Sequence, residues 1–188
     1  MRMGDPVHQP ATYEDLRDVP EHLVAELVAG ELHTQPRPTL VHARAASRLN
    51  RKLGPFDEDD GDGPGGWIIL MEPELHLGTD VLVPDVAGWR RETMPELPQV
   101  GHASTRPDWL CEVLSPSTAA HDRVRKLPIY AARGVPHVWL LDPERRTLEV
   151  MRLDGDTYRA VGTYADTDRV RAEPFEAIEL DLPSLWQR

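Results

Sequence analysis

The sequence predicts an α/β domain in which a mixed β-sheet is flanked by helices and followed by additional antiparallel strands. In the middle of the chain, short apolar runs that suit buried strands alternate with segments whose apolar residues recur at helical spacing. Near the C-terminus, alternating patterns are separated by turn residues, which is typical of an antiparallel meander. A length of 188 residues fits one domain, residues 1–188.

The first third of the chain predicts a short helix, a hairpin and a long helix. Thr12 suits a helix N-cap, because its hydroxyl can accept a hydrogen bond from a free backbone N–H. Strand-like runs flank Ala29-Gly30, the pattern of two strands joined by a tight turn. Apolar residues recur at helical spacing from Thr39 and stop at Gly54-Pro55. The expected elements are a helix at 12–16, strands at 23–28 and 31–34, and a helix at 39–53.

The middle of the chain predicts a series of strands and one further helix, after an acidic, Gly-rich loop. The stretch 109–114 is the clearest buried strand, because it is apolar apart from one carboxylate. The helix that follows it is expected to end at Gly134, a suitable left-handed C-cap, with Pro128 near its first turn, where a missing N–H costs least. Residues 90–106 are expected to be irregular. The expected strands are at 67–71, 74–77, 81–83, 86–89, 109–114, 138–141, 148–153, 157–164 and 175–180.

Composition and charge limit the compartment and the partners. No run approaches the roughly 18 apolar residues that span a bilayer, and the N-terminus lacks the apolar stretch of a secretory signal. Cys111 is the single cysteine, so no intrachain disulfide can form, and a cytoplasmic protein without a membrane partner is expected. The net charge of −11 argues against a nucleic-acid binder, since such proteins usually carry a basic surface. A bound divalent metal would offset part of a local negative field.

Two carboxylates interrupt apolar stretches of the predicted sheet. Glu112 lies within a buried strand, and Asp85 follows Pro84 between two apolar stretches. A carboxylate is rarely buried without a partner or a metal. Two carboxylates on neighbouring strands supply oxygen ligands for Mg²⁺ or Mn²⁺, and the backbone carbonyl of Val113 can add a further ligand. Taken singly, each acid can equally pair with an arginine or lie at a strand end in water.

Lys126 follows the Glu112 strand and lies four residues after Asp122. On a helix that returns across the sheet, its amine can reach the same sheet edge. There it can orient an attacking water or stabilise the charge that develops on phosphoryl oxygens. The alternative is an Asp122–Lys126 ion pair on the helix surface, which contributes roughly 0.3–0.5 kcal/mol. The spacing allows both interpretations.

Three separated stretches resemble the Uma family of the PD-(D/E)XK nuclease superfamily. They are LVAGELHTQPRPTLVHARAASRL, VLVPDVAGW and PDWLCEVLSPSTAAHDRVRKLPIYAARGVPHVWLLDPERRTLEV, in the family's order. The resemblance implies a restriction-endonuclease-like core over about residues 12–153, with a C-terminal strand extension over residues 154–188. It also implies a metal-dependent endonuclease site that hydrolyses phosphodiester bonds, with DNA as the partner.

The resemblance further implies roles for individual residues. Pro84-Asp85 matches the family's PD element, and Glu112 matches the acidic residue of its (D/E)XK element. Leu114 stands where the superfamily's lysine usually stands, and Lys126 matches a lysine that this family carries on the following helix. Four further candidates are Glu31 as an additional metal-site carboxylate, Glu26 as a secondary one, His42 as a substrate contact and Asp122 as a helix cap or a residue that positions Lys126.

Two other classes of function stay open. A non-catalytic family member can keep the fold as a binding module, which the net charge and Leu114 favour. An acidic protein-interaction module is favoured by the run of acidic residues at 57–62. The eight histidines show no paired spacing suited to zinc, so no zinc site is predicted. A homodimer is expected for a nuclease, because two symmetric sites suit the cutting of both strands of a duplex.

Overall fold

Two main β-sheets, a separate two-stranded sheet and the helices around them form the computed structural model, which describes residues 9–57 and 61–187. The elements follow in the order α1 (Tyr13–Arg17), β1 (Leu23–Val28), β2 (Glu31–Pro36), α2 (Leu40–Asp57), β3 (Trp67–Met71), β4 (Glu74–Leu77), β5 (Asp80–Leu82), β6 (Val86–Arg90), β7 (His102–Ala103), β8 (Trp109–Val113), α3 (Ala119–His121), the π-helix η1 (Asp122–Lys126), α4 (Leu127–Ala132), β9 (His137–Asp142), β10 (Thr147–Asp154), β11 (Thr157–Ala165), β12 (Arg169–Val170), β13 (Leu180–Asp181) and α5 (Pro183–Trp186).

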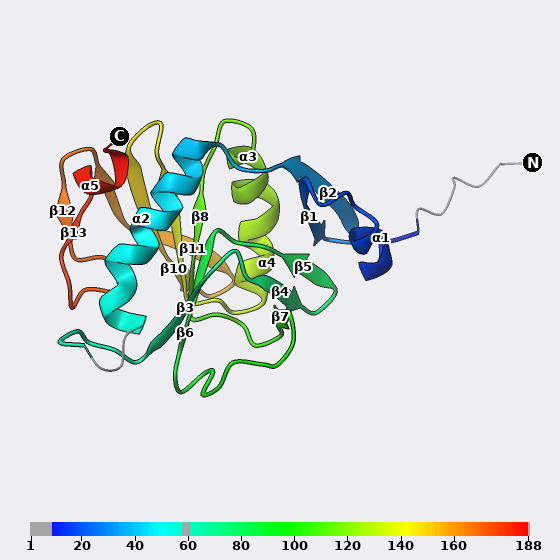
Figure 1. Ribbon diagram of the computed structural model, residues 1–188, viewed down its shortest axis with the longest axis horizontal. Helices are drawn as coiled ribbons and strands as arrows, with labels where there is room; N and C mark the ends of the chain where they lie inside the picture. The colour runs from blue at the N-terminus through cyan, green and yellow to red at the C-terminus, as the bar shows by residue number, and fades with distance from the viewer. Residues whose placement is uncertain (1–8, 58–60, 188) are drawn as a thin grey trace, which may run out of the picture.

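The larger sheet is mixed and has the strand order β11-β10-β9-β8-β6-β3, in which only β8 and β9 pair in parallel. The smaller sheet has the order β2-β1-β5-β4-β7, and its β4–β7 pair is parallel. In Figure 1, α2 and α4 lie on opposite sides of the larger sheet, and the β1–β2 hairpin lies beyond α4 with α1 beside it. This arrangement confirms the predicted α/β class and its additional C-terminal antiparallel strands.

Side-chain alternation along β8 divides the interior into two cores. Trp109, Cys111 and Val113 pack into the core that α2 covers, while Leu110 and Leu114 pack into the core that α4 and the smaller sheet cover. Successive residues of a strand point to opposite faces, so the carboxylate of Glu112 points to the α4 side. The register of this one strand therefore decides which helix can supply a partner for Glu112.

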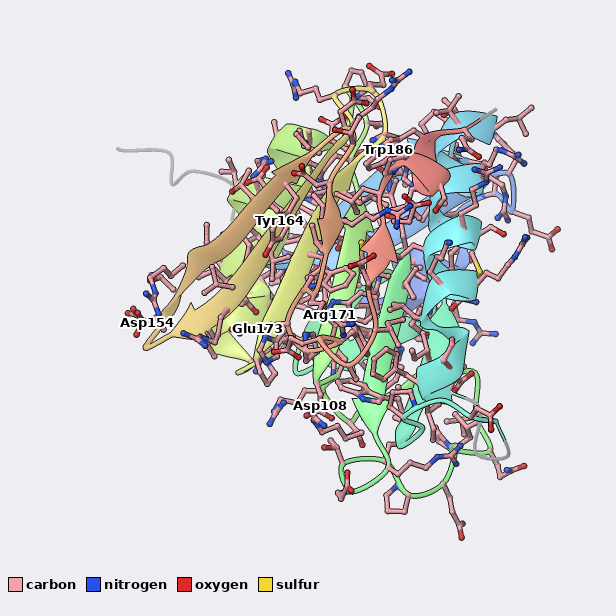
Figure 2. All side chains as sticks on the ribbon, turned by 90° about the vertical axis from the view of Figure 1, so that its left-hand side faces the viewer. Asp108, Asp154, Tyr164, Arg171, Glu173 and Trp186 are labelled. Carbon is pink, nitrogen blue, oxygen red and sulfur yellow. The ribbon has the colours of Figure 1, made fainter. Side chains whose placement is uncertain are left out.

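The core under α2 is closed by aromatic rings from distant parts of the chain. The ring centroids of Trp109 and Trp139 lie 5.1 Å apart in an edge-to-face contact. Phe175 adds its ring at 4.9 Å from Trp109 and 5.6 Å from Trp139. Figure 2 shows the C-terminal segment that carries Arg171 and Glu173 lying over the strands of the larger sheet beside α2. The last residues of the chain are thus packed into the same core as α2.

The predicted end of the long helix is wrong. Helix α2 passes Gly54 and ends at Asp57, so Pro55 lies inside its last turn. A proline this close to the helix end removes one backbone hydrogen bond. Phe56 is buried and its ring lies 4.7 Å from that of Phe175, and this burial outweighs the lost bond.

The strand predicted over residues 175–180 is also wrong. The N–H of Phe175 donates to the carbonyl of Ala172, and the N–H of Ile178 donates to the carbonyl of Phe175, so the segment is a series of turns. Only Leu180 enters a strand, the two-residue β13. Phe175 and Leu180 are buried in the core and Ile178 packs against it, because turns rather than one continuous strand bring these residues there.

The helix predicted to end at Gly134 consists of three consecutive segments, α3, η1 and α4. At the end of η1 the N–H of Leu127 donates to the carbonyl of Asp122, five residues back, which makes one wide turn. Pro128 follows directly and lies in the first turn of α4, although the helical stretch as a whole begins at Ala119. The wide turn accommodates the proline, which has no N–H to donate. Gly134 ends the helix with φ +73°, as predicted.

Across residues 9–57 and 61–187, none of the helices combines the length and the apolar content that crossing a membrane requires.

Replacing Phe175 by alanine should lower the free energy of unfolding by about 3–5 kcal/mol, because the change empties the centre of the aromatic core. Urea denaturation followed by tryptophan fluorescence measures this loss. Leu97→Ala is the matched control, since Leu97 is 47% exposed and should change stability by less than about 0.5 kcal/mol. A similar loss in both variants would show that Phe175 does not hold the C-terminal segment in the core.

Candidate active site

The ammonium of Lys126 lies among buried carboxylates from three parts of the chain. Its Nζ is 2.8 Å from Oε1 of Glu26 and 2.8 Å from Oε1 of Glu112. Oδ1 of Asp122 lies 3.9 Å away. All four residues are buried, and Lys126 is only 2% exposed. Together with Asp85, these residues are called the acidic cluster below.

The elements of the fold explain why these side chains meet. Glu112 points from β8 toward the α4 side, and η1 crosses that side. Asp122 and Lys126 are the first and last residues of η1, and both are buried. Wide π-type turns are rare and often occur at functional sites. Glu26 comes from β1. Its Oε1 accepts a hydrogen bond of 2.7 Å from the backbone N–H of Val83.

Asp85 is held at the end of β8 by two contacts. Its Oδ2 accepts a hydrogen bond from the backbone N–H of Val113 at 2.7 Å. Its Oδ1 lies 2.5 Å from Nε2 of His42, in the first turn of α2. His42 therefore orients the carboxylate of Asp85. The sequence had suggested His42 as a substrate contact. The sequence also suggested the carbonyl of Val113 as a metal ligand, and the contact in the structure is made by its N–H.

Tyr130 is a member of the site that sequence reasoning missed. Its hydroxyl donates a hydrogen bond of 2.6 Å to Oε1 of Glu112, and the residue is fully buried. Tyr130 comes four residues after Lys126, so a helical spacing search around the lysine would have found it. Lys126 and Tyr130 both contact Oε1 of Glu112, which leaves Oε2 for another partner.

Glu31 is not brought to the acidic cluster. Its side chain is 56% exposed, and its Oε2 lies 2.5 Å from Nη2 of Arg125 and 3.4 Å from Nε2 of His33. Glu31 pairs with Val28 next to the hairpin turn, which places it away from the buried part of β1. Glu26, the secondary candidate from the sequence, contacts Lys126 instead.

Burial and mutual repulsion set the charge of the cluster. Burial raises the pKa of Glu112 well above its usual range, and Lys126 opposes this shift only in part. Burial likewise raises the pKa of Asp122 to about 6. Burial disfavours the Lys126 ammonium, but Glu112 and Glu26 outweigh it and hold the pKa of Lys126 well above its ordinary value. The cluster thus contains more acid than its one lysine can neutralise, and a divalent cation would balance the excess.

A cavity of about 380 Å³ gives access to the cluster. Asp85, Glu112, Asp122 and Lys126 line the cavity, while neither Glu26 nor Glu31 lines it. The lining also includes the polar residues Arg37, Thr39, His42, Ser115, Ser117 and Thr118. Carboxylate oxygens at the base of an accessible cavity are the ligand type that Mg²⁺ and Mn²⁺ prefer.

Comparison with known proteins identifies the fold and the family of the chain. The solved structure of a protein described as a "putative nuclease belonging to DUF820", from Anabaena variabilis ATCC 29413, superposes with a TM-score of 0.74 at 20% identity, over 94% of this chain and 98% of that one. This likeness supports the predicted restriction-endonuclease-like fold. No curated protein matches the chain. The model of the family Uma2, described as "Putative restriction endonuclease", matches residues 10–183. The predicted family is thereby confirmed, and the chain belongs to the Uma2 family.

Proposed function

We propose that the protein is a metal-dependent endonuclease that hydrolyses phosphodiester bonds in DNA with Mg²⁺ or Mn²⁺. One observation carries the proposal: Asp85, Glu112 and Lys126 line the same cavity, although the chain separates the first and last by 41 positions. Two carboxylates and an ammonium are the groups that metal-assisted phosphodiester hydrolysis requires. The family description supports the reaction class.

Asp85 and Glu112 would hold the metal, with Oε2 of Glu112 free of Lys126 and Tyr130. The carbonyl of Val113 is proposed as a further ligand, since its N–H already ties this part of β8 to Asp85. When bound, the metal neutralises charge on the phosphate and lowers the pKa of a bound water. His42 orients Asp85 and Tyr130 orients Glu112, so both ligands would be held in place before substrate binds.

Lys126 would act as a fixed positive charge. Hydrolysis adds a water oxygen to phosphorus and releases one ester oxygen, so negative charge grows on the phosphoryl oxygens. Because Glu26 and Glu112 keep Lys126 protonated, it can donate hydrogen bonds to water or to a phosphoryl oxygen, but it cannot take a proton as a base. Glu26 is a positioning residue, since it contacts the amine and does not line the cavity.

The proposed substrate is DNA, and the proposed assembly is a homodimer that cuts both strands. Arg37 lines the cavity and offers one cation to the phosphate backbone near the cluster. The net charge of −11 predicts weak binding of DNA without metal. The position of Lys126 weighs against the alternative of an inactive binding module, because the amine missing at Leu114 is present in the cluster from another element.

Plasmid cleavage tests the proposal. The purified protein should nick or linearise supercoiled plasmid in Mg²⁺ or Mn²⁺ and leave it intact in EDTA. Glu112→Gln should lower the rate by at least about 100-fold, since even the partners of metal ligands cost roughly 10–100-fold when they are removed. Glu96→Gln, an exposed acid that does not line the cavity, should cleave at the wild-type rate. Equal cleavage by Glu112→Gln and wild type would refute the site.

A further inference from the structure

A second group of ligating side chains lies on the smaller sheet. Glu74 and His76 from β4 and His102 from β7 each offer one ligand atom, and these atoms all lie within 4.8 Å of one another. None of the three lines the cavity of the candidate active site. We propose that they form a transition-metal site that takes Zn²⁺ and stabilises this part of the fold.

Strand alternation and one parallel pair assemble the three residues. On β4, Leu75 and Leu77 are buried in the core, so Glu74 and His76 point to the opposite face of the sheet and are half-buried. The parallel pairing of β7 with β4 places His102 directly beside Glu74. His76 and His102 are 26 positions apart in the chain, so no short sequence motif indicates the site. The sequence therefore predicted no zinc site.

The ligand atoms of the group lie near the spacing that an ion requires, and one pair is joined by a hydrogen bond. Nε2 of His76 lies 2.7 Å from Oε1 of Glu74. The rings of His76 and His102 stack with centroids 3.9 Å apart and an angle of 12° between their planes. Zinc–ligand bonds of about 2.0–2.2 Å place neighbouring ligand atoms roughly 3–4 Å apart. Small side-chain rotations would bring the ligand atoms of this group to those distances.

Tyr13 acts as an orienting partner. Its hydroxyl donates a hydrogen bond of 2.9 Å to Oε1 of Glu74, and its ring meets that of His76 edge-on at 5.0 Å. Tyr13 and His76 both approach Oε1, so Oε2 of Glu74 stays available for the ion. A ligating carboxylate is commonly held by such a hydrogen bond. The site would thus link α1, β4 and the short strand β7.

Two imidazoles and one carboxylate favour Zn²⁺, with water in the fourth position. The acidic cluster offers mainly oxygen atoms and favours Mg²⁺ or Mn²⁺. The two sites therefore differ in ligand chemistry. The expected role of zinc is to hold β7, which has only one ladder partner within the described residues, against β4.

Calorimetric titration of Zn²⁺ into chelator-treated, full-length protein tests the site. Wild type should bind one equivalent that weakens at least about 100-fold in His102→Gln and in His76→Gln, and that persists in Asp85→Asn. His22→Gln is the matched control, because His22 is exposed and lies outside the group. Zinc at about 100 times its dissociation constant should raise the melting temperature of wild type by about 5–10 °C, and of His102→Gln by far less.

Zinc binding of equal affinity in wild type and His102→Gln would overturn the proposal, as would loss of zinc in Asp85→Asn alone. X-ray absorption of zinc-loaded wild type does not depend on the folding of any variant. It should show two imidazoles and oxygen ligands around zinc, and a shell with fewer than two imidazoles would also overturn it. None of these readouts requires nuclease activity, so the test is independent of the proposed function.

Discussion

Lys126→Ala should lower the rate of plasmid cleavage by about 100–1,000-fold, because it removes the fixed positive charge from the lining of the cavity. The same change should lower the free energy of unfolding by about 3–5 kcal/mol, since Glu26 and Glu112 would lose the cation that offsets the cost of burying them. Cleavage is therefore measured at a temperature at which circular dichroism shows the variant to be folded.

Two variants separate the chemical effect from the loss of stability. Lys52→Ala removes the other lysine of the chain, which lies outside the acidic cluster, and should change neither quantity strongly. Tyr130→Phe removes the hydroxyl that donates to Glu112 and should cost about 1–3 kcal/mol in stability while it keeps the amine. Tyr130→Phe should therefore lower the cleavage rate by roughly 10-fold, which is less than the loss expected for Lys126→Ala. If folded Lys126→Ala cleaves as fast as Tyr130→Phe, the role assigned to the lysine is wrong.

Asp85→Asn should weaken Mg²⁺ binding by at least about 100-fold in a calorimetric titration, because it removes one charged ligand from the proposed metal site. The asparagine has the same shape, and its side-chain oxygen can still accept from the N–H of Val113. The fold should therefore survive the change. His42→Gln should weaken binding less, by roughly 10-fold, since His42 orients the carboxylate through one contact.

Asp62→Asn is the matched control for this titration. Asp62 is exposed and lies in the acidic loop after α2, so its removal lowers the net negative charge equally without touching the cavity. Mg²⁺ binding that falls equally in Asp62→Asn and Asp85→Asn would indicate general attraction to an acidic surface. That result would favour the acidic interaction module over the nuclease.

The proposed zinc site of Glu74, His76 and His102 could not be predicted from local sequence patterns. Glu74 and His76 alternate with leucines on β4, which the sequence predicts as a strand. His102 lies in a segment predicted to be irregular, and its two-residue strand exists only because it pairs with β4. A ligand set that depends on a parallel pair between distant segments has no local signature.

The sequence by itself determined the class of the fold and most of the strands, and it singled out the two acids of the candidate site. Strands and helices leave periodic patterns, and a carboxylate such as Glu112 stands out within an apolar run because its burial is costly without a partner. The resemblance to a family added Lys126, which spacing left undecided between a surface ion pair and a site residue.

Only the tertiary structure decided which further residues join the site. Glu26 and Glu31 both lie on the predicted hairpin, but the pairing of β1 with β5 brings Glu26 to Lys126, while the turn leaves Glu31 exposed beside Arg125. The wide turn at η1 aims Asp122 and Lys126 inward, and aromatic packing draws the C-terminal segment into turns. These outcomes depend on contacts between distant segments, and a local sequence pattern does not show how strongly such segments interact.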